Sequence, residues 1–284
     1  MRSFLIPRLR GCAWLAVFLS LADLSLADPP RPPLVVAHRG ASHDAPENTL
    51  PAFRLAWEQG ADAIEGDFFL TKDGHIVCTH DRMTGRLNPG KVKLQVADST
   101  LAELQALDVG SWKGERWRGE RMPTLAEVFA TVPAGKRILI EVKCGPEILP
   151  ALVREIGKCS LRPEQLTIIS FKASVIAAAK DSLPDVEAFW LTSFGRDKES
   201  GELAPTPESI LKTLREVGAD GLSCGDHDSL SAEFLSSVRQ AGCETHCWTV
   251  DDPVRARALV SIGMQSVTTN RPALIREALR VKAR

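Results

Sequence analysis

Short apolar segments alternate with helical segments along most of this 284-residue chain. The apolar segments have the length and composition of strands that are buried on both faces. Leaving out one short hairpin partner, the principal strands are predicted at residues 34–38, 63–70, 137–143, 166–170, 187–191, 221–224, 244–250 and 265–268. Eight strands separated by helices predict fold class α/β and favour a closed (β/α)8 TIM barrel over an open doubly wound sheet.

Polar or functional side chains stand at the carboxyl ends of several predicted strands. They are His38, Asp67, Lys143, Ser170, Trp248 and Asn270. A barrel brings all of its strand ends to one mouth, whereas an open sheet spreads them out. This distribution favours the barrel and places the candidate site at its mouth.

The alternation breaks after the second strand. A turn at residues 72–74 predicts a hairpin in which residues 75–79 pair with that strand. Residues 82–120 are rich in Gly, Arg, Lys and Trp and contain one predicted helix, over residues 101–107. We therefore expect a small insertion, at about residues 82–120, over one end of the barrel.

The N-terminal segment has the pattern of a signal peptide. Three arginines precede an apolar stretch over residues 12–22, and small residues stand at the positions read for cleavage near Ala27. The apolar stretch is too short for a comfortable membrane span. We expect residues 1–27 to be removed, the protein to be periplasmic or secreted without stable membrane insertion, and residues 28–284 to form the barrel domain.

Charge and cysteine content narrow the function classes. The chain has 35 basic and 36 acidic residues, and this balance gives no basic footprint for nucleic acid. Six of the seven cysteines follow the predicted signal peptide, and their spacing has no metal-site signature. Disulfides in an exported protein and buried free thiols both remain open.

Three acidic residues form a candidate metal site. Glu65 and Asp67 share one face of a predicted strand because side chains two residues apart point the same way. Glu141 and Lys143 share a face of the next principal strand in the same manner. Three carboxylates that converge in a barrel mouth repel one another, and a hard divalent cation removes that repulsion. The sequence therefore predicts one Mg²⁺ or Ca²⁺ ion held by Glu65, Asp67 and Glu141.

Two histidines are the candidate proton carriers. His38 and His80 each stand beside a charged residue, and an imidazole titrates near neutrality, so one ring can donate a proton while the other accepts one. Arg39 and Lys143 supply positive charge for a phosphoryl group. For Lys143, a salt bridge to Glu65 or Glu141 is an alternative or additional role.

The other histidines and two tryptophans are weaker candidates. His75 is expected in a solvated turn, whereas His43, His227 and His246 stand at positions that allow a site role or a purely structural one. Two tryptophans of the insertion, Trp112 and Trp117, are expected either to line an apolar lip or to pack the insertion itself.

Eight motifs together resemble the glycerophosphodiester phosphodiesterases, a family of the phosphatidylinositol-specific phospholipase C-like phosphodiesterase superfamily. They are HRGASHDAPENTLPAF, EGDFFLTKDGHIVCTHD, STLAEL, MPTLAEVF, ILIEVK, IISF, CWTVDD and SVTTNRP. Each motif alone is weak, but their order and spacing are specific, and the resemblance extends over about residues 34–280. Two departures, His43 in the first loop and Gly66 between the two acids, leave every motif residue in place.

The resemblance implies a barrel with a small insertion and a metal-dependent reaction that releases sn-glycerol 3-phosphate and an alcohol from a small-molecule glycerophosphodiester. It implies the same metal ligands as above and an acid–base pair of His38 and His80. It further implies that Arg39 and Lys143 lie near the phosphate and that Glu47 and Trp248 line the pocket. Attack on phosphorus by the glycerol 2-hydroxyl, through a cyclic phosphate, and direct attack by water both remain open.

Two further hypotheses compete with this one. A lysophospholipase D-like enzyme needs a wide apolar mouth at the insertion to admit an acyl chain. A non-catalytic barrel that binds glycerophosphodiesters is expected to lack a histidine or a metal acid, and this chain lacks neither.

Overall fold

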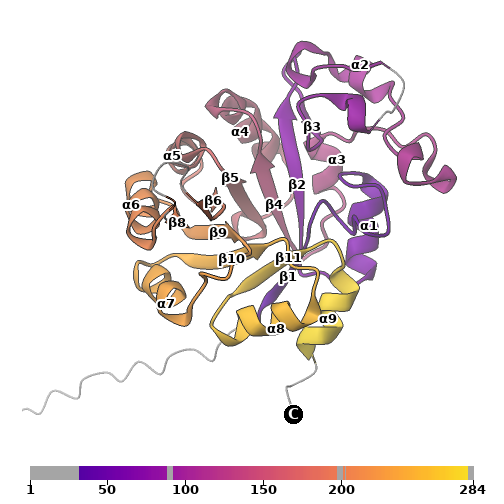
Figure 1. The fold of residues 1–284 in the computed structure, drawn as a ribbon. Coiled ribbons are helices and arrows are strands. Elements are labelled where there is room, and N and C mark those ends of the chain that lie inside the picture. The colour runs from indigo at the N-terminus through magenta and orange to yellow at the C-terminus, as the bar shows by residue number, and fades with distance from the viewer. Residues whose placement is uncertain (1–31, 88–91, 197–200, 202, 281–284) are drawn as a thin grey trace, which may run out of the picture. The chain divides into compact units, whose positions relative to one another are not determined.

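The computed structural model describes residues 32–87, 92–196, 201 and 203–280. In this part of the chain, eight parallel strands form a ring with helices around it (Figure 1). The ring closes because β1 (Leu34–Ala37) pairs with β2 (Ala63–Leu70) on one side and with β11 (Ser266–Thr269) on the other. The predicted (β/α)8 barrel is confirmed, and the open sheet is excluded.

The strands and helices follow one another in the predicted order. The other barrel strands are β4 (Arg137–Val142), β5 (Leu166–Ser170), β6 (Glu187–Thr192), β9 (Gly221–Gly225) and β10 (Glu244–Trp248). The helices between and after them are α1 (Leu50–Glu58), α3 (Leu125–Phe129), α4 (Leu149–Lys158), α5 (Ala173–Ser182), α6 (Pro207–Val217), α7 (Ala232–Gln240), α8 (Pro253–Ser261) and α9 (Pro272–Arg280). Short 3₁₀ helices η5 (Pro146–Ile148) and η6 (Pro163–Gln165) precede α4 and β5.

The first βα loop is fixed at both of its ends. Thr49 caps α1, because its hydroxyl accepts a hydrogen bond from the amide of Ala52 at 3.4 Å. The amide of Asn48 donates to the carbonyl of Arg39 at 3.0 Å. These bonds hold Glu47 and Asn48 at the barrel mouth, next to the end of β1.

Apolar side chains fill the barrel below its mouth. They are Val36, Ala63, Leu139, Ile169, Phe189 and Leu191, with Trp248 packed against them. A larger apolar layer lies between the strands and the helices and includes Phe53, Phe68 and Ile140. The interior is therefore a packed and largely apolar core, and the charged strand-end residues lie at the mouth, where the βα loops begin.

The predicted insertion follows β3 (Ile76–Cys78), which pairs antiparallel with β2. It contains the short 3₁₀ helices η1 (Thr84–Arg86), η2 (Val96–Asp98), η3 (Ser111–Lys113) and η4 (Glu115–Trp117), and the helix α2 (Leu101–Gln105). A small apolar cluster that includes Val96, Leu104 and Met122 lies within it. The sequence predicted the helix but not the 3₁₀ turns, which are too short to produce a periodic pattern.

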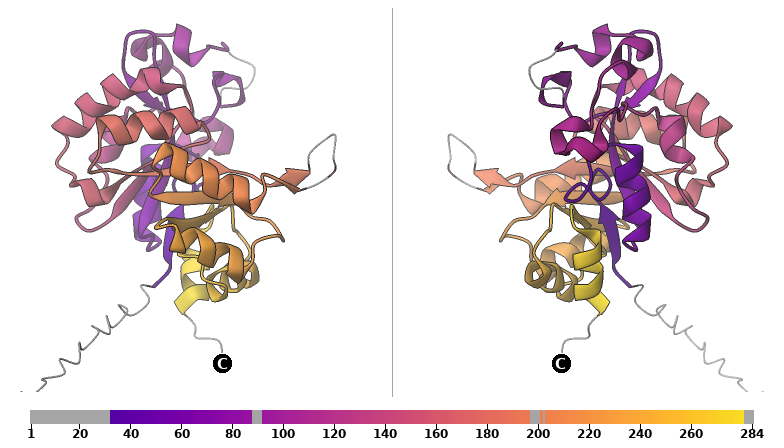
Figure 2. Two further views of the ribbon diagram at one scale, coloured as in Figure 1. Left: turned by 90° about the vertical axis from the view of Figure 1, so that its left-hand side faces the viewer. Right: turned by 90° about the vertical axis from the view of Figure 1, so that its right-hand side faces the viewer.

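One hairpin was not predicted, and one predicted segment lies outside the described residues. The short strands β7 (Gly195–Arg196) and β8 (Leu203–Ala204) form an antiparallel hairpin that projects from the barrel (Figure 2). The predicted signal peptide lies outside the described residues and stays a prediction. In the described part of the chain, no helix has the length and apolar character needed to cross a membrane.

The six cysteines of the described residues are free thiols. They are Cys78, Cys144, Cys159, Cys224, Cys243 and Cys247. Four of them are buried, as expected for small apolar side chains in a core of this size. Of the two alternatives left open by the sequence, the structure has the free thiols.

Candidate active site

Three carboxylates from two adjacent strands meet at the mouth. Glu65 and Asp67 lie on β2 and Glu141 on β4, where Asp67 and Glu141 are register partners. One oxygen of each carboxylate lies within 4.8 Å of the others, and the three residues are 2%, 1% and 9% exposed. The fold therefore gathers the acids that the sequence predicted to share a site.

Hydrogen bonds orient the two carboxylates on β2. The Asn48 amide Nδ2 donates to Asp67 Oδ2 at 2.7 Å, and the backbone amide of Arg39 donates to Glu65 Oε2 at 2.9 Å. Of the other oxygens, Glu65 Oε1 is buried without a hydrogen-bond partner among the described residues, and Asp67 Oδ1 faces the ammonium of Lys143. An unpaired buried acceptor costs free energy, so Glu65 Oε1 is suited to a bound cation.

Lys143 lies against two of the acids. Its Nζ is 2.6 Å from Glu141 Oε1 and 3.2 Å from Asp67 Oδ1. The alternative salt bridge to Glu141 is thus present, and the second partner is Asp67 rather than Glu65. Residues 65 and 67 share a strand face, so spacing alone did not separate them.

The acids differ in how they hold protons. Burial and the charges of Asp67 and Glu141 raise the pKa of Glu65 well above its usual range. Burial and Asp67 raise the pKa of Glu141 to about 7. Burial alone would raise the pKa of Asp67 as well, but Lys143 and Arg39 bring it below its usual value. Full ionisation of all three acids is therefore unfavourable without a bound cation, and oxygen ligands of this kind fit Mg²⁺ or Ca²⁺.

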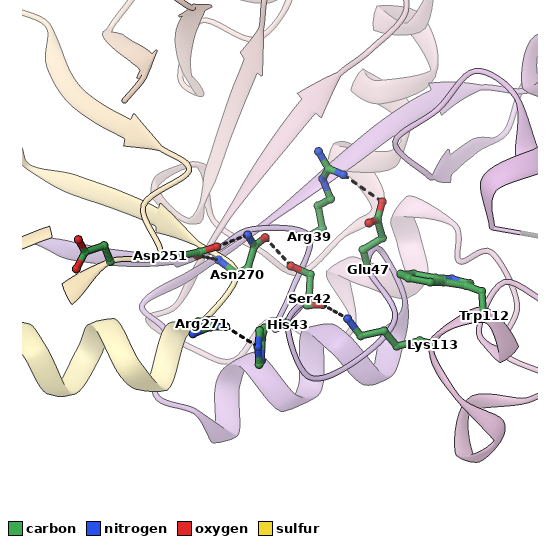
Figure 3. A pocket seen from close by; sticks show the side chains of 10 residues that line it. Arg39, Ser42, His43, Glu47, Trp112, Lys113, Asp251, Asn270 and Arg271 are labelled. Atoms are coloured by element: carbon green, nitrogen blue, oxygen red, sulfur yellow. Dashed lines mark hydrogen bonds and ion pairs between the residues drawn. The ribbon is translucent and has the colours of Figure 1, made fainter. Parts of the chain in front are cut away.

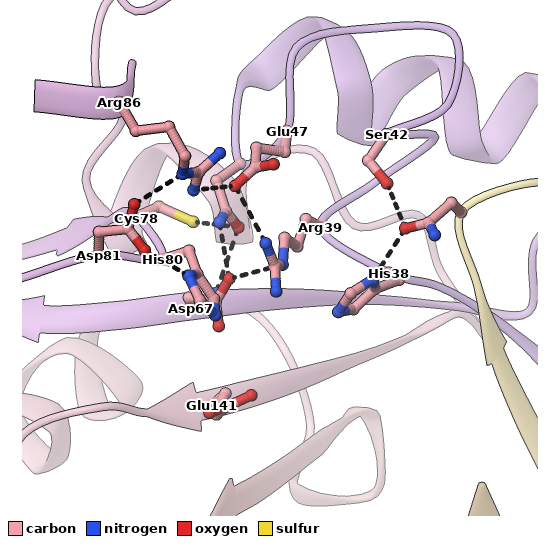
Figure 4. Close-up of polar contacts among 12 residues, drawn as sticks. His38, Arg39, Ser42, Glu47, Asp67, Cys78, His80, Asp81, Arg86 and Glu141 are labelled. Carbon is pink, nitrogen blue, oxygen red and sulfur yellow. Dashed lines mark hydrogen bonds and ion pairs between the residues drawn. The ribbon is translucent and has the colours of Figure 1, made fainter. Parts of the chain in front are cut away.

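His38 stands at the end of β1. The Nδ1 of its ring, which is labelled in Figure 4, lies 2.8 Å from Asn270 Oδ1. Asn270 Nδ2 donates to Asp251 Oδ2 at 2.6 Å (Figure 3). Because an amide oxygen only accepts hydrogen bonds, His38 Nδ1 carries the hydrogen and Nε2 has a free lone pair. Burial and the adjacent Arg39 lower the pKa of His38, so the ring is neutral near pH 7.

His80 has a different partner. Its Nδ1 lies 2.6 Å from Asp81 Oδ1, and the second oxygen of Asp81 accepts from Arg86 Nε at 2.6 Å. Asp81 therefore orients the ring of His80 through Nδ1 and leaves Nε2 free to face the cavity. Both rings are thus held through Nδ1, His38 by an amide oxygen and His80 by a carboxylate.

Arg39 links the loop to the cluster. Its guanidinium lies 3.1 Å from Glu47 Oε1 and 3.2 Å from Asp67 Oδ2, and Glu47 also binds Arg86 at 2.8 Å. The residue has φ of 57°, in the left-handed region that a residue with a side chain rarely adopts. That conformation aims the amide of Arg39 at Glu65, and strain of this kind is typical of functional sites.

A cavity of about 140 Å³ lies over these groups. Its polar lining includes His38, Arg39, Glu65, His80, Glu141 and Lys143, and its apolar lining includes Ile169, Phe171, Leu191 and Trp248. The rings of Phe171 and Trp248 meet edge to face with their centroids 5.5 Å apart. The cavity thus joins a charged wall to an apolar one at the scale of a small polar molecule.

Comparison with known proteins identifies the family. The glycerophosphoryl diester phosphodiesterase family matches residues 38–274, which include every candidate site residue. The chain belongs to this family. The predicted enzyme class, a phosphodiesterase of this family, is thereby confirmed.

Members of this phosphodiesterase family resemble the chain over most of its length. It is 50% identical over 250 residues to a Mycobacterium tuberculosis protein named Probable glycerophosphodiester phosphodiesterase 1, covering 84% of this chain and 90% of that one. It is 32% identical over 243 residues to the glycerophosphodiester phosphodiesterase of Caldanaerobacter subterraneus, covering 84% and 94%. An Oleispira antarctica phosphodiesterase, solved with its product sn-glycerol-3-phosphate, has a TM-score of 0.77 and 28% identity, covering 88% and 97%.

Most other histidines of this family member have structural partners. His246 is buried between Ser266, at 2.8 Å, and Glu244, at 3.2 Å. His227 binds Ser229 at 2.8 Å on the loop after β9. Neither lines the cavity over the acids. The weak expectation of a site role for these two histidines finds no support.

The remaining candidates, His43, His75 and Trp112, lie outside the cavity over the acids. His75 is exposed in its turn, as expected, whereas His43 lies between Asp44 and Arg271. His43 and Trp112 line a separate groove of about 550 Å³ (Figure 3). That groove is polar, because most of its other lining residues are charged or hydrogen-bonding. They include Ser42, Glu47, Lys113, Asp251, Asn270 and Arg271.

Sequence reasoning gave no role to several residues that shape the phosphodiesterase site. Asn48 stood in a motif without a role of its own, and Asn270 was placed at the barrel mouth without a contact assigned to it. Asp81 lies just before the insertion and Arg86 lies within it, and only the fold shows that Asp81 binds His80 while Arg86 binds Asp81 and Glu47. Asp251 was visible only as one of two acids after β10.

Proposed function

We propose that this protein hydrolyses glycerophosphodiesters to sn-glycerol 3-phosphate and an alcohol with one divalent cation and two histidines. One observation carries the proposal: a cluster of three buried carboxylates contributes Glu65 and Glu141 to a cavity that two imidazoles also line, and each imidazole meets an acceptor oxygen at Nδ1 and leaves Nε2 free. A metal together with an acid–base pair is a site for phosphate ester cleavage. The product bound by the Oleispira relative supports the substrate class.

His38 acts as the base. Its Nε2 lone pair faces no protein donor among the described contacts, whereas Nδ1 is engaged by Asn270. It removes the proton from the nucleophile: either water, which gives sn-glycerol 3-phosphate directly, or the glycerol 2-hydroxyl, whose cyclic phosphate is then opened by water. Asn270 acts as a positioning residue, since Asp251 accepts hydrogen bonds from both its side-chain amide and its backbone amide, at 2.6 and 2.7 Å. This pair keeps the imidazole in one tautomer.

His80 acts as the acid. Asp81 holds its Nδ1, and Arg86 holds Asp81, so the ring is oriented with Nε2 free to give its proton to the leaving alcohol oxygen. A poor leaving group such as an alkoxide needs this proton. After release of the alcohol, the two imidazoles have exchanged their protonation states, and solvent resets them.

Arg39 and Lys143 bind the phosphate oxygens. Both side chains line the cavity, and each is already held by acids, so their charges are fixed in place before substrate arrives. Glu47 acts indirectly, because it binds Arg39 and Arg86 and so fixes both guanidinium groups. Such preorganised charges stabilise a transition state without reorganisation at the moment of reaction.

Glu65, Asp67 and Glu141 hold the cation. The cation supplies Lewis acid stabilisation of charge on the phosphoryl oxygens. The three residues bring one carboxylate oxygen each within 4.8 Å of the others, and their burial keeps water from competing for the site. Trp248 and Phe171 form the apolar wall against which the glycerol carbons pack.

A lysophospholipase D-like reaction fits the structure less well. The groove that contains Trp112 is lined mainly by charged and polar side chains, and an acyl chain gains little by burial there. Trp117 packs against Arg116 within the insertion, with 4.7 Å between the guanidinium carbon and the ring centroid. The two tryptophans therefore form no wide apolar lip, and the deacylated diester is the better substrate.

Hydrolysis of glycerophosphocholine by protein stripped of divalent ions tests the proposal. We expect no release of sn-glycerol 3-phosphate until Mg²⁺ or Ca²⁺ is added. His38→Ala should lower turnover about 10²–10⁴-fold, as loss of acid–base catalysis does. Glu164→Gln, an exposed acid far along the chain, is the control variant. Full activity without divalent ions would exclude the metal, and tight binding without product would favour the non-catalytic barrel.

A further inference from the structure

A second cavity, of about 700 Å³, opens beside His80. The described residues that line it include four cations against one carboxylate, Asp81. The cations are Arg82, Arg86, Lys93 and Lys143. We name this space the basic cavity. No step of the proposed reaction uses Arg82 or Lys93.

The basic cavity adjoins the catalytic one. His80 and Lys143 line both spaces. Because His80 protonates the leaving oxygen, the alcohol portion of the substrate lies on the His80 side of phosphorus. The basic cavity is the space on that side, and it receives whatever the alcohol carries.

Two of the four cations are available to a ligand. Arg86 is held by Glu47 at 2.8 Å and by Asp81 at 2.6 Å, and Lys143 is held by Glu141 at 2.6 Å. The side chains of Arg82 and Lys93 have no hydrogen bond or ion pair within the described ranges of the chain. Their charges are uncompensated by any close carboxylate and attract an anion.

The backbone that carries these two cations is well ordered by hydrogen bonds. The amide of Val96 donates to the carbonyl of Arg82 at 2.9 Å, and Thr84 exchanges two bonds with Leu94, at 2.9 and 3.0 Å. The stem of Lys93 lies across Gly85, since a Cβ built at Gly85 would be 3.1 Å from its Cγ and Cδ. The ammonium of Lys93 is therefore placed by packing as well as by charge.

We propose that the basic cavity is a subsite for an alcohol portion that bears a second anionic group, such as a phosphate monoester. Arg82 and Lys93 bind that group, and the exposed face of Met83 and the ring of Phe69 border the carbon skeleton between the two phosphates. The inference rests on the proposed function, because the position of the alcohol follows from the role of His80. It makes Arg82 and Lys93 determinants of specificity rather than of catalysis.

A matched pair of substrates tests the inference. One is glycerophosphoglycerol, and the other is the same diester with a phosphate on its terminal hydroxyl. We expect the wild type to prefer the phosphorylated diester in kcat/KM. Arg82→Gln and Lys93→Gln should each lower that preference about fivefold to tenfold, the worth of one charge-assisted bond at a partly exposed site. Each variant should hydrolyse glycerophosphoglycerol at a rate within about twofold of the wild type. This substrate has no second anionic group for either cation to bind.

Controls separate this inference from the proposed function. Lys212→Gln removes an exposed cation of α6 and should leave the preference unchanged. Added salt should reduce the preference of the wild type, because it screens exposed charges. No preference in the wild type, or an equal loss on both substrates in the variants, would overturn the subsite while leaving the proposed function intact. Failure to hydrolyse either diester with Mg²⁺ or Ca²⁺ present would overturn both.

Discussion

His38 and Asn270 lie 232 positions apart in the chain, and His38 Nδ1 meets Asn270 Oδ1 at 2.8 Å. Asn270 is in turn fixed by two hydrogen bonds to Asp251, at 2.6 and 2.7 Å. The first and last strands of the barrel are neighbours, and closure of the ring brings these residues together. A ring-closing contact thus determines which nitrogen of His38 faces the substrate.

Loss of the Asn270 amide should impair chemistry more than binding. We expect Asn270→Ala to lower kcat about 10-fold to 100-fold, with KM nearly unchanged, because the base then samples the wrong tautomer. ¹⁵N chemical shifts of His38 should change from one tautomer to a mixture. Ser42→Ala is the control, since Ser42 donates to the same oxygen at 2.8 Å without holding the ring. A single unchanged tautomer in Asn270→Ala would contradict the positioning role.

The protonation of His38 should respond to pH below the usual histidine range. Burial and Arg39 lower its pKa beneath 6.5, so the folded protein binds fewer protons at this site than the unfolded chain as pH falls. As pH drops from 6.5 towards the pKa of His38 in the folded state, this histidine therefore lowers the free energy of unfolding by an increasing amount. NMR titration of labelled histidines, assigned with His38→Ala, should give a midpoint below 6.5. A midpoint at or above that value would refute the prediction.

His80→Ala should show a dependence on the leaving group. With an alkyl alcohol as leaving group we expect a loss of about 10²–10⁴-fold, because the departing oxygen then receives no proton. With the p-nitrophenyl ester of sn-glycerol 3-phosphate most of that loss should vanish, since nitrophenolate leaves without protonation.

The base variant provides the contrast for this experiment. His38→Ala should be impaired on both substrates, because attack on phosphorus precedes departure in each. Initial rates for the two variants on the two diesters measure the difference. Equal losses for His80→Ala on both esters would assign the proton donor elsewhere.

Divalent ions should stabilise the protein through the acidic cluster. At a concentration about 100 times Kd, a ligand adds about 2.7 kcal/mol to the free energy of unfolding. For a domain of this size that corresponds to a rise in Tm of about 5–10 °C. Glu141→Gln should abolish most of the rise, whereas Glu164→Gln should keep it. Thermal melts with and without Mg²⁺ or Ca²⁺ measure the effect, and an equal shift in both variants would place the ion elsewhere.

Gly40→Ala should destabilise the loop that carries the site. Gly40 has φ of +79°, and a Cβ there would lie 2.6 Å from the carbonyl carbon of Ala52 in α1. We expect a cost of about 3 kcal/mol or more from backbone strain and overpacking together. Gly74→Ala is a matched control with φ of +80° and open space around it, so only about 1–2 kcal/mol is expected. Urea unfolding compares the two, and equal costs would mean that α1 moves aside without penalty.

The local sequence was enough to predict the barrel and the residues of its mouth. Short apolar strands between helices predict parallel βα units, because strands buried on both faces need helices to cover them. The two-residue repeat of a strand places Glu65 with Asp67, and Glu141 with Lys143, on common faces. These relationships depend only on neighbours along the chain.

Tertiary structure decided what each of these side chains contacts. Lys143 binds Asp67 rather than Glu65 as its second partner, and this choice depends on a contact between strands. The tautomer of His38 likewise depends on its contact with Asn270. The pairing of Asp81 with Arg86 also depends on three-dimensional contacts. So does the convergence of Arg82 and Lys93 on one cavity. Sequence periodicity gives the direction of a side chain from its own strand or helix, whereas distances between residues on different elements are fixed only when the ring closes and the insertion packs against it.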